Sequence, residues 1–449
     1  MMGVSLSRWT MSYFAAALLA LVAAEIMMTA GYGFPAAAIA APETLLLVHV
    51  VAIGWLSLLM CGALLQFLPV LVAQPLYSNA LALPALVSLI AGLVALILAF
   101  LQLGGGIHPG MPFFAIAAIL LSVGFVLILW NLARTMISAQ STPLPARFVI
   151  VSLVCVAFTV TLGAIFALVL GGTTAYGPFV SLTAFGLPIH VAAGLGGWLT
   201  FAAMGVSYRL LAMFMLSPEL DRAATKGALY LGTVALAIAI AGGIMAVLIE
   251  GDPSLALLGA FAVGLLALLL YGSDVLHLYR ARKRRNIELN SRMAAIALAS
   301  LAASIVITSI LLATGRLADH IGAVVFLIAF GWLSGLGLAQ LYKIVAFLTW
   351  LECYGPALGK ARTPRVQDLV VEKRAGKWFL LYFIAVWAGT VALLLGFPSA
   401  FRLAAALQLM ATAGIVVQLV RTRRATDVNA DQRFPPGTRR PHLLLSHQA

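Results

Sequence analysis

Three histidines are the residues in this sequence whose type and spacing could do chemistry. His49, His190 and His320 each stand a short distance before a Gly-Trp pair within a long apolar run. A neutral imidazole is a good ligand for iron, copper and zinc, and a polar side chain inside a membrane is costly unless it serves a partner. One such histidine would more often be a helix-packing residue. Three at related positions favour at least one metal or haem site.

The Gly-Trp pairs belong to a longer repeated motif. The copies read Gly54-Trp55-Leu56-Ser57, Gly197-Trp198-Leu199-Thr200 and Gly331-Trp332-Leu333-Ser334. A small residue follows eight positions after the first glycine and a polar one after twelve, as Gly62 and Gln66, Gly205 and Arg209, and Ala339 and Lys343. Glycine allows helices to approach closely and tryptophan fills the space beside it, which is the interpretation we prefer for the motif.

A second motif repeats in the same order along the chain. Asn131-Leu132-Ala133-Arg134, His277-Leu278-Tyr279-Arg280 and Gln418-Leu419-Val420-Arg421 each close an apolar run. Self-similarity at a long period indicates duplicated structural units. We therefore predict three pseudo-symmetric units of four helices each, at about 1–140, 141–287 and 288–424.

Composition places the chain in a membrane. Hydrophobic residues make up 63% of it and charged residues 9%, whereas globular proteins average about 45–50% and about 25%. The net charge of +13 lies in a few loops between apolar runs, so it indicates membrane topology rather than nucleic-acid binding. The three cysteines show no paired spacing, which argues against a disulfide framework or a thiolate metal site.

The apolar runs predict an all-α integral membrane protein with twelve transmembrane helices, since a helix needs about 20 apolar residues to cross the hydrocarbon core. The predicted spans are 12–32, 44–73, 81–103, 112–135, 147–171, 180–212, 226–249, 253–278, 292–314, 318–350, 378–397 and 401–421. The second, sixth and tenth are the longest and carry the Gly-Trp pairs. Each unit therefore has its marked helix in second place.

The positions of arginine and lysine predict the orientation, because these residues accumulate in cytoplasmic loops. The loop after span eight holds Arg280, Arg282, Lys283, Arg284, Arg285 and Arg292, and the loop after span ten holds Lys360, Arg362, Arg365, Lys373, Arg374 and Lys377. With an even number of spans, both termini are expected in the cytoplasm of a cell with a bacterial-type plasma membrane. Residues 425–449 are polar and proline-containing, so we expect a disordered cytoplasmic tail.

Glu25 is the one carboxylate that we expect to be buried within a span. It lies in the outer half of the first helix, where it could approach the histidines. An intramembrane carboxylate is a functional hypothesis by default, here proton transfer or a hydrogen bond to a ligand imidazole. The structural alternative is a hydrogen bond to a serine or threonine of a neighbouring helix.

With these features, the chain resembles the catalytic subunit of the haem-copper oxidase superfamily and its divergent NnrS-like relatives. The segments that look most like the family are LLLVHVVAIGWLSLLMCGALLQFLPV and DHIGAVVFLIAFGWLSGLGLAQLYKIVAF. The resemblance implies twelve helices in three groups of four. It also implies that His49 and His320 are axial ligands of a low-spin haem, and that His190 lies where the family places a ligand of copper or a non-haem metal.

Two departures from the family argue against an ordinary oxygen-reducing centre. Residues 227–249, the seventh span, contain no histidine, whereas the oxidases supply two more metal ligands there. The tenth span has one histidine rather than a closely spaced pair. In addition, His320 precedes its Gly-Trp by six more residues than His49 does, roughly 9 Å of helix. A site that uses His49 with His190 therefore remains an alternative.

These features lead to a first functional hypothesis and two alternatives. The first is a haem-binding, oxidase-like membrane protein involved in electron transfer or in oxygen or nitric oxide chemistry, with non-covalent haem b because no CxxCH motif is present. If it is an enzyme, it is a haem-dependent oxidoreductase with Glu25 as its proton-transfer group. The alternatives are a twelve-helix transporter and a non-catalytic protein that handles or senses haem or copper. The sequence indicates no redox partner and no oligomeric state.

Overall fold

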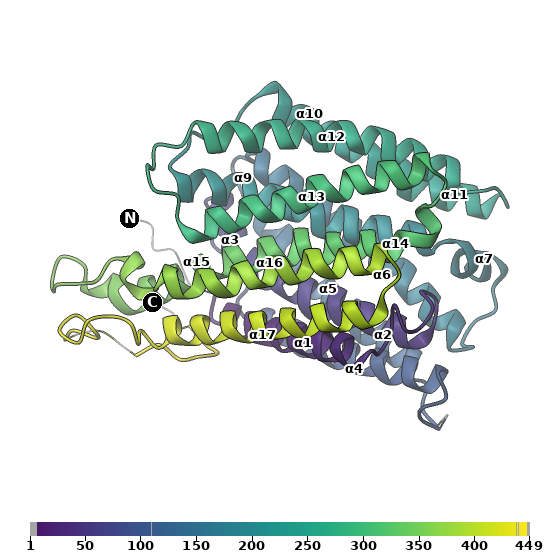
Figure 1. Cartoon of the computed structure of the whole chain (residues 1–449), viewed down its shortest axis with the longest axis horizontal. Coiled ribbons are helices and arrows are strands. Elements are labelled where there is room, and N and C mark those ends of the chain that lie inside the picture. Colours follow the sequence, from purple (N-terminus) through teal and green to yellow (C-terminus); the bar gives the residue numbers. More distant parts are fainter. Residues whose placement is uncertain (1–6, 109, 437, 439, 447–449) are drawn as a thin grey trace. The chain divides into compact units, whose positions relative to one another are not determined.

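The chain folds entirely into helices and connecting loops in the part that the structure describes, which is residues 7–108, 110–436, 438 and 440–446 (Figure 1). The structure is a computed structural model. The first half contains α1 (Thr10–Ala30), α2 (Pro42–His49), η1 (Val50–Ser57), α3 (Leu58–Leu71), α4 (Ala82–Leu103), α5 (Phe113–Ile137), α6 (Leu144–Leu170), α7 (Gly177–Phe185), α8 (Leu187–Val191), η2 (Ala192–Phe201) and α9 (Ala202–Met215). The second half contains α10 (Ala223–Ala237), η3 (Ile238–Gly242), α11 (Gly243–Leu248), α12 (Ser254–Arg280), α13 (Leu289–Ala313), α14 (Leu317–Phe326), η4 (Leu327–Ser334), α15 (Gly335–Tyr354), η5 (Gly355–Ala357), η6 (Val366–Leu369), α16 (Glu372–Leu394) and α17 (Pro398–Arg423).

Twelve continuous helical runs among the described residues are long and apolar enough to cross a membrane, which confirms the predicted fold class. They are Thr10–Ala30, Pro42–Leu71, Ala82–Leu103, Phe113–Ile137, Leu144–Leu170, Leu187–Met215, Ala223–Leu248, Ser254–Arg280, Leu289–Ala313, Leu317–Ala357, Glu372–Leu394 and Pro398–Arg423. The second, sixth and tenth are the longest, at 30, 29 and 41 residues, as the sequence predicted.

The residues fall into two compact units. The terminal unit comprises Met1–Gly62 and Ile287–Ala449, and the central unit comprises Ala63–Asn286, so that the first boundary lies inside α3. The second boundary lies beside the predicted end of the second repeat at residue 287. The repeat boundaries themselves stay predictions.

The helices nevertheless pair in the pattern that three repeats require. The span that carries Gly-Trp packs against the span before it in each repeat: η1 against α1, η2 against α6, and η4 against α13. The remaining two spans of each repeat also pack against each other: α4 against α5, α10 against α12, and α16 against α17. The same arrangement of two helix pairs therefore occurs three times along the chain.

Glycines of the repeated motif bring these helices together. A Cβ atom added to Gly197 would lie 2.5 Å from Cβ of Cys155 on α6, and one added to Gly331 would lie 2.9 Å from Cβ of Ser300 on α13. Eight residues after the first glycine, Gly62 makes the same approach to α1, at 2.7 Å from Cβ of Tyr13. Helices in lipid associate through close packing, because lipid tails are as apolar as leucine side chains. The motif is thus a packing device in both units.

All three Gly-Trp pairs lie in π-helical turns, a feature that the sequence did not predict. The segments η1, η2 and η4 contain the three motifs, and a fourth π-helical segment, η3, interrupts the seventh span. A π-helix bonds each carbonyl to the N–H five residues later, which inserts one residue without breaking the hydrogen-bonded ladder. In η4 the side chain of Ser334 donates to the carbonyl of Ala329, five residues before it, at 2.7 Å.

The sixth span differs from its predicted range of 180–212. The structure has a separate helix, α7, followed by a break at Gly186 and a new start at Leu187. Pro188 explains the break, because proline has no N–H to donate and is favoured in the first turn of a helix. The membrane-length helix therefore begins at Leu187, only three residues before His190.

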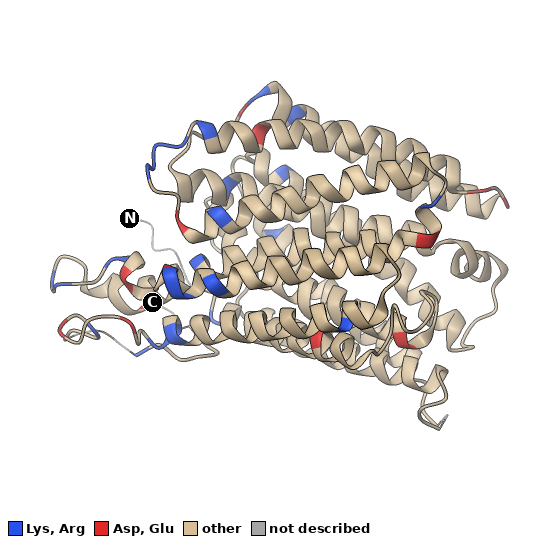
Figure 2. Ribbon diagram, in the orientation of Figure 1, with Lys and Arg blue, Asp and Glu red and all other residues tan. Residues whose placement is uncertain are grey.

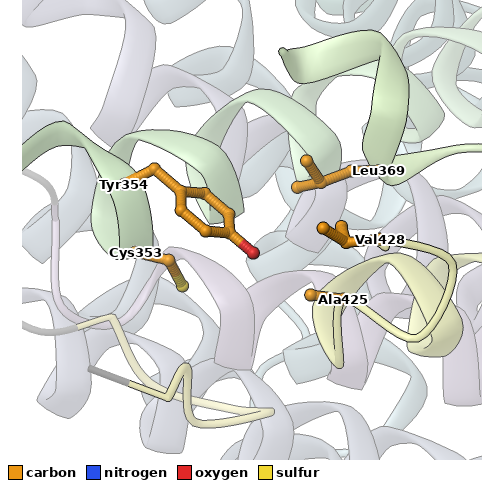
Figure 3. Close-up of a cluster of buried hydrophobic side chains, with 5 residues drawn as sticks. All are labelled: Cys353, Tyr354, Leu369, Ala425 and Val428. Atoms are coloured by element: carbon orange, nitrogen blue, oxygen red, sulfur yellow. The ribbon is translucent and has the colours of Figure 1, made fainter. Parts of the chain in front are cut away.

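A small hydrophobic cluster closes one end of the terminal unit (Figure 3). Cys353 and Tyr354 at the end of α15 pack against Leu369 of η6 and against two residues that follow α17, Ala425 and Val428. The ring of Phe434 also stacks on Tyr354, at 6.5 Å between centroids. Residues from both the loop between α15 and α16 and the segment after α17 thus contribute to one core.

The C-terminal segment makes further contacts through Arg423. Its guanidinium pairs with Glu352 at 2.7 Å and donates to the carbonyls of His442 and Leu445 at 2.9 Å each. The backbone N–H of Ser446 donates to the carbonyl of Arg8 at 3.0 Å, so the described ends of the chain lie at the same end of the terminal unit. The disorder expected for residues 425–449 stays a prediction, to be tested against these contacts.

Basic residues gather at this end of the terminal unit (Figure 2). The first turn of α16 carries Lys373 and Arg374, and α17 ends on Arg423. The opposite helix ends carry acidic residues, Glu43 in the first turn of α2 and Asp319 in the first turn of α14. The distribution agrees with the predicted orientation. Which end is cytoplasmic stays a prediction.

Substituting a glycine of the motif should destabilise the protein. Gly331→Ala places a methyl group against α13 and should cost about 1–3 kcal/mol through overpacking. Gly272→Ala on α12 is the matched control, because nothing lies within 4 Å of its added Cβ. Thermal unfolding in detergent should show a lower midpoint for the first variant and not for the second. Equal midpoints would contradict the packing role of the motif.

Asp427 should make stability depend on pH. Burial opposes ionisation of this carboxyl, but hydrogen bonds and charges from Arg421 and Arg374 outweigh it and hold the pKa of Asp427 below its usual range. A carboxyl whose pKa is lower in the folded state stabilises the fold above its unfolded pKa of about 3.9, and this contribution disappears as pH falls through the folded-state pKa.

The corresponding measurement compares wild type with Asp427→Asn in thermal unfolding across pH. Wild type should unfold at the higher temperature at pH 7, and the difference should shrink below pH 4. A difference that stays constant over this pH range would mean that the carboxylate charge does not contribute.

Candidate functional site

His49 is positioned by the junction between α2 and η1 in the terminal unit. Its Nδ1 lies 2.6 Å from the carbonyl oxygen of Leu45, one turn earlier in the same helix. A carbonyl can only accept, so Nδ1 carries the proton and the lone pair resides on Nε2. Metal-binding histidines are commonly oriented by such a bond from the other ring nitrogen. His49 thus has the tautomer and the fixed ring that a metal ligand needs.

His320 lies near the start of α14, also in the terminal unit. Its Nε2 lies 2.9 Å from a guanidinium nitrogen of Arg316, one turn earlier. Arginine is a donor only, so Nε2 accepts with its lone pair. This nitrogen could ligate a metal only after the bond to Arg316 is broken. The structure therefore does not present His320 as it presents His49.

His190 lies in the central unit, and its imidazole packs against α6. The ring centroid is 5.5 Å from that of Phe166, and a Cβ added to Gly163 would lie 3.2 Å from Cε1 of His190. Gly163 therefore makes room for the imidazole. These contacts are those of a helix-packing residue, the structural alternative that the sequence left open. Its role as a metal ligand stays a prediction.

Throughout the described residues, no group of three or more His, Cys, Asp or Glu side chains is arranged to hold a metal ion. His190 is therefore not part of such a group. Haem makes a smaller demand, since one or two axial ligands suffice. His49, with its Nδ1 held by Leu45, is the candidate for one of them.

Glu25 lies on α1 and is fully buried in the terminal unit. Its Oε1 accepts hydrogen bonds from Gln408 Nε2 at 3.0 Å and from Thr412 Oγ1 at 2.8 Å, both on α17. Neither Glu25 Oε2 nor Gln408 Oε1 has a hydrogen-bond partner among the described residues, although both atoms are buried. The bond to a threonine of a neighbouring helix, which was the structural alternative for Glu25, is present, and the second oxygen of the carboxyl accepts no hydrogen bond from the described residues.

A second set of polar residues lies beside this carboxyl. The indole of Trp55 in η1 donates to Ser334 Oγ in η4 at 2.7 Å, so the Gly-Trp motifs of the second and tenth spans contact each other directly. The hydroxyl of Tyr382 on α16 donates to the carbonyl of Phe330 in η4 at 3.0 Å. The phenol of Tyr382 also lies within electrostatic range of Glu25. The terminal unit thus has a buried polar centre shared by α1, η1, η4, α16 and α17.

The expectation that Glu25 is the one buried carboxylate of a span was wrong. Asp274 on α12, in the central unit, is also fully buried and accepts from Tyr208 on α9 and from Arg222, each at 3.1 Å. Glu352 on α15 is buried as well, in its pair with Arg423. Asp274 stands inside a predicted span, and that placement was the signal that the sequence offered.

Neither a family model nor a curated protein matches the sequence. The structure does match a solved protein, a haem-copper terminal oxidase determined as a dimer by cryo-electron microscopy, with a TM-score of 0.65. The match covers 97% of this chain and 84% of the oxidase chain, at 11% identity. The chain therefore has the fold of a haem-copper oxidase chain, as the resemblance implied. The NnrS-like subtype stays a prediction.

Removing the carboxylate of Asp274 should destabilise the protein. Asp274→Ala leaves the hydroxyl of Tyr208, which is buried, without its acceptor, at a cost of about 1–3 kcal/mol. The control is Asp252→Ala, because Asp252 is exposed in a loop and bonds only locally to Ser254. Thermal unfolding in detergent should separate the two variants. If both unfold at the wild-type temperature, the buried network is not a structural element.

Proposed function

We propose that this chain is an oxidase-fold membrane protein that holds a non-covalent b-type haem through His49 and takes part in electron transfer or in oxygen or nitric oxide chemistry. The observation that carries the proposal is the geometry of His49. Its Nδ1 is engaged by the carbonyl of Leu45, which directs the lone pair to Nε2. The proposal concerns the cofactor and its redox chemistry, without assigning a turnover reaction.

The fold supports this proposal through the similarity to a haem-copper terminal oxidase over nearly the whole chain. His49 stands on the second span and His320 on the tenth, where the resemblance implies the axial ligands of a low-spin haem. These two spans also contact each other through Trp55 and Ser334. Both histidines belong to the terminal unit. Bound haem would supply one-electron redox chemistry at its iron.

The second axial ligand is the open element of the proposal. His320, which lies in the same unit as His49, can serve if Arg316 releases its Nε2. Copper or non-haem iron at His190 stays a separate prediction, and no group of three or more His, Cys, Asp or Glu side chains among the described residues supports it. We further propose a bacterial-type plasma membrane with both termini in the cytoplasm, which the charge distribution supports.

The test is the visible spectrum of the detergent-purified protein from haem-replete cells, first oxidised and then reduced. Wild type should show a six-coordinate, low-spin b-type spectrum that sharpens on reduction. His49→Ala should lose this signal and remain folded, since helix packing rather than one ligand holds the bundle. His277→Ala should keep it, because His277 is exposed near the end of α12.

The remaining two histidines identify the second ligand. Loss of the low-spin spectrum in His320→Ala, with His190→Ala unchanged, assigns the pair implied by the resemblance. The opposite result assigns His190. A colourless wild-type protein that cannot take up haem afterwards would rule out the proposal and favour a transporter.

A further inference from the structure

A buried carboxyl with one unsatisfied oxygen lies in the terminal unit, and helix packing does not account for it. Glu25 is 0% exposed, and only its Oε1 is hydrogen-bonded. A bare carboxylate in hydrocarbon needs a counter-charge, a proton or full hydrogen bonding. No side chain of a basic residue bonds to this carboxyl within the described part of the chain. The Glu25 site therefore requires something that the side chains do not supply.

The unused hydrogen-bond acceptors at Glu25 and Gln408 show what would complete the site. Gln408 donates through Nε2 to Glu25, so its own Oε1 is held nearby, and this atom also lacks a donor. Two unused acceptors cannot bond to each other. A proton on Glu25 Oε2 turns one of them into a donor, and one internal water can then accept from Glu25 and donate to Gln408. Buried polar groups are routinely completed by such waters.

We infer that Glu25 is a proton-binding site, completed by one internal water against Gln408, and that it takes up and releases one proton with the redox state of the haem. The redox linkage rests on the proposed function. One electron added to bound haem, from a reductant such as dithionite, would favour the acid form of Glu25, so that the carboxylate would take one proton from water. Loss of that electron would return the proton to water.

The titratable and charged groups around Glu25 favour Glu25 itself as the group that binds the proton. Tyr382 is the titratable group that faces it from α16, and η1 carries no titratable residue. Of the arginines on α17, Arg421 and Arg423 lie in its last turn, and Arg402 donates through Nε to the carbonyl of Thr29 at 3.0 Å, beyond Glu25 toward the end of α1. Glu25 stands five residues before the end of α1, roughly 7.5 Å along the helix. The path of a proton between Glu25 and that end is therefore short.

Infrared difference spectroscopy of the haem-loaded protein, reduced with dithionite, tests the inference. Wild type should gain the C=O stretch of a neutral carboxylic acid on reduction, and this band should shift in heavy water. Glu25→Gln should keep the haem spectrum and lose the band. Thr412→Val should move the band, since it removes a donor to Oε1. Thr390→Val is the matched control, because this buried threonine donates to the carbonyl of Val386 in its own helix rather than to Glu25.

The redox potential gives a second readout that a merely structural role would not move. The haem midpoint potential should fall as pH rises in wild type and become independent of pH in Glu25→Gln. A haem-containing protein whose carboxylic band and pH dependence survive this substitution would overturn the inference. A second result would also overturn it: wild type unfolds at a higher temperature in sodium chloride than in choline chloride, and Glu25→Gln abolishes this difference. A metal cation would then occupy the site instead of a proton. A colourless protein overturns the proposed function instead.

Discussion

The close approach of each Gly-Trp helix to the helix before it is the constraint on which the rest of the structure depends. Lipid provides no hydrophobic force between helices, so a pair holds through backbone proximity and complementary side chains. Glycine at 197 and 331 gives that proximity, because any Cβ there would overlap the neighbouring helix. The same device recurs in three spans. The positions of the residues that precede and follow each motif are thereby fixed relative to its partner helix.

The π-helical turns at these motifs have consequences for the polar centre of the terminal unit. A π-helical turn shifts all later side chains around the helix axis relative to earlier ones. In this unit the result is a direct bond from Trp55 to Ser334, which joins the two marked helices. The carbonyl of Phe330, in the same turn, accepts from Tyr382. Buried polar groups thus meet at π-helical turns, which are frequent at functional sites.

Two buried carboxyl groups illustrate how structural and functional roles differ. Both oxygens of Asp274 are bonded, one to Tyr208 and one to Arg222, so its charge is matched and its role is structural. Glu25 has two donors on one oxygen and none on the other. Breaking a fully matched network costs stability, whereas an incompletely matched group can exchange a proton or bind a ligand. The distinction depends on individual oxygen atoms, not on burial.

The sequence alone predicts the twelve spans and the greater length of the second, sixth and tenth, because hydropathy and motif spacing are local properties of the chain. It also identified His49 and Glu25 as candidates. The folded structure, in contrast, shows that Nδ1 of His49 is engaged by Leu45, that Arg316 engages His320, and that His190 packs over Gly163. The sequence also did not predict the π-helical turns or the burial of Asp274. One-residue shifts in helical register and contacts between distant spans depend on how helices pack, which a hydropathy pattern does not encode.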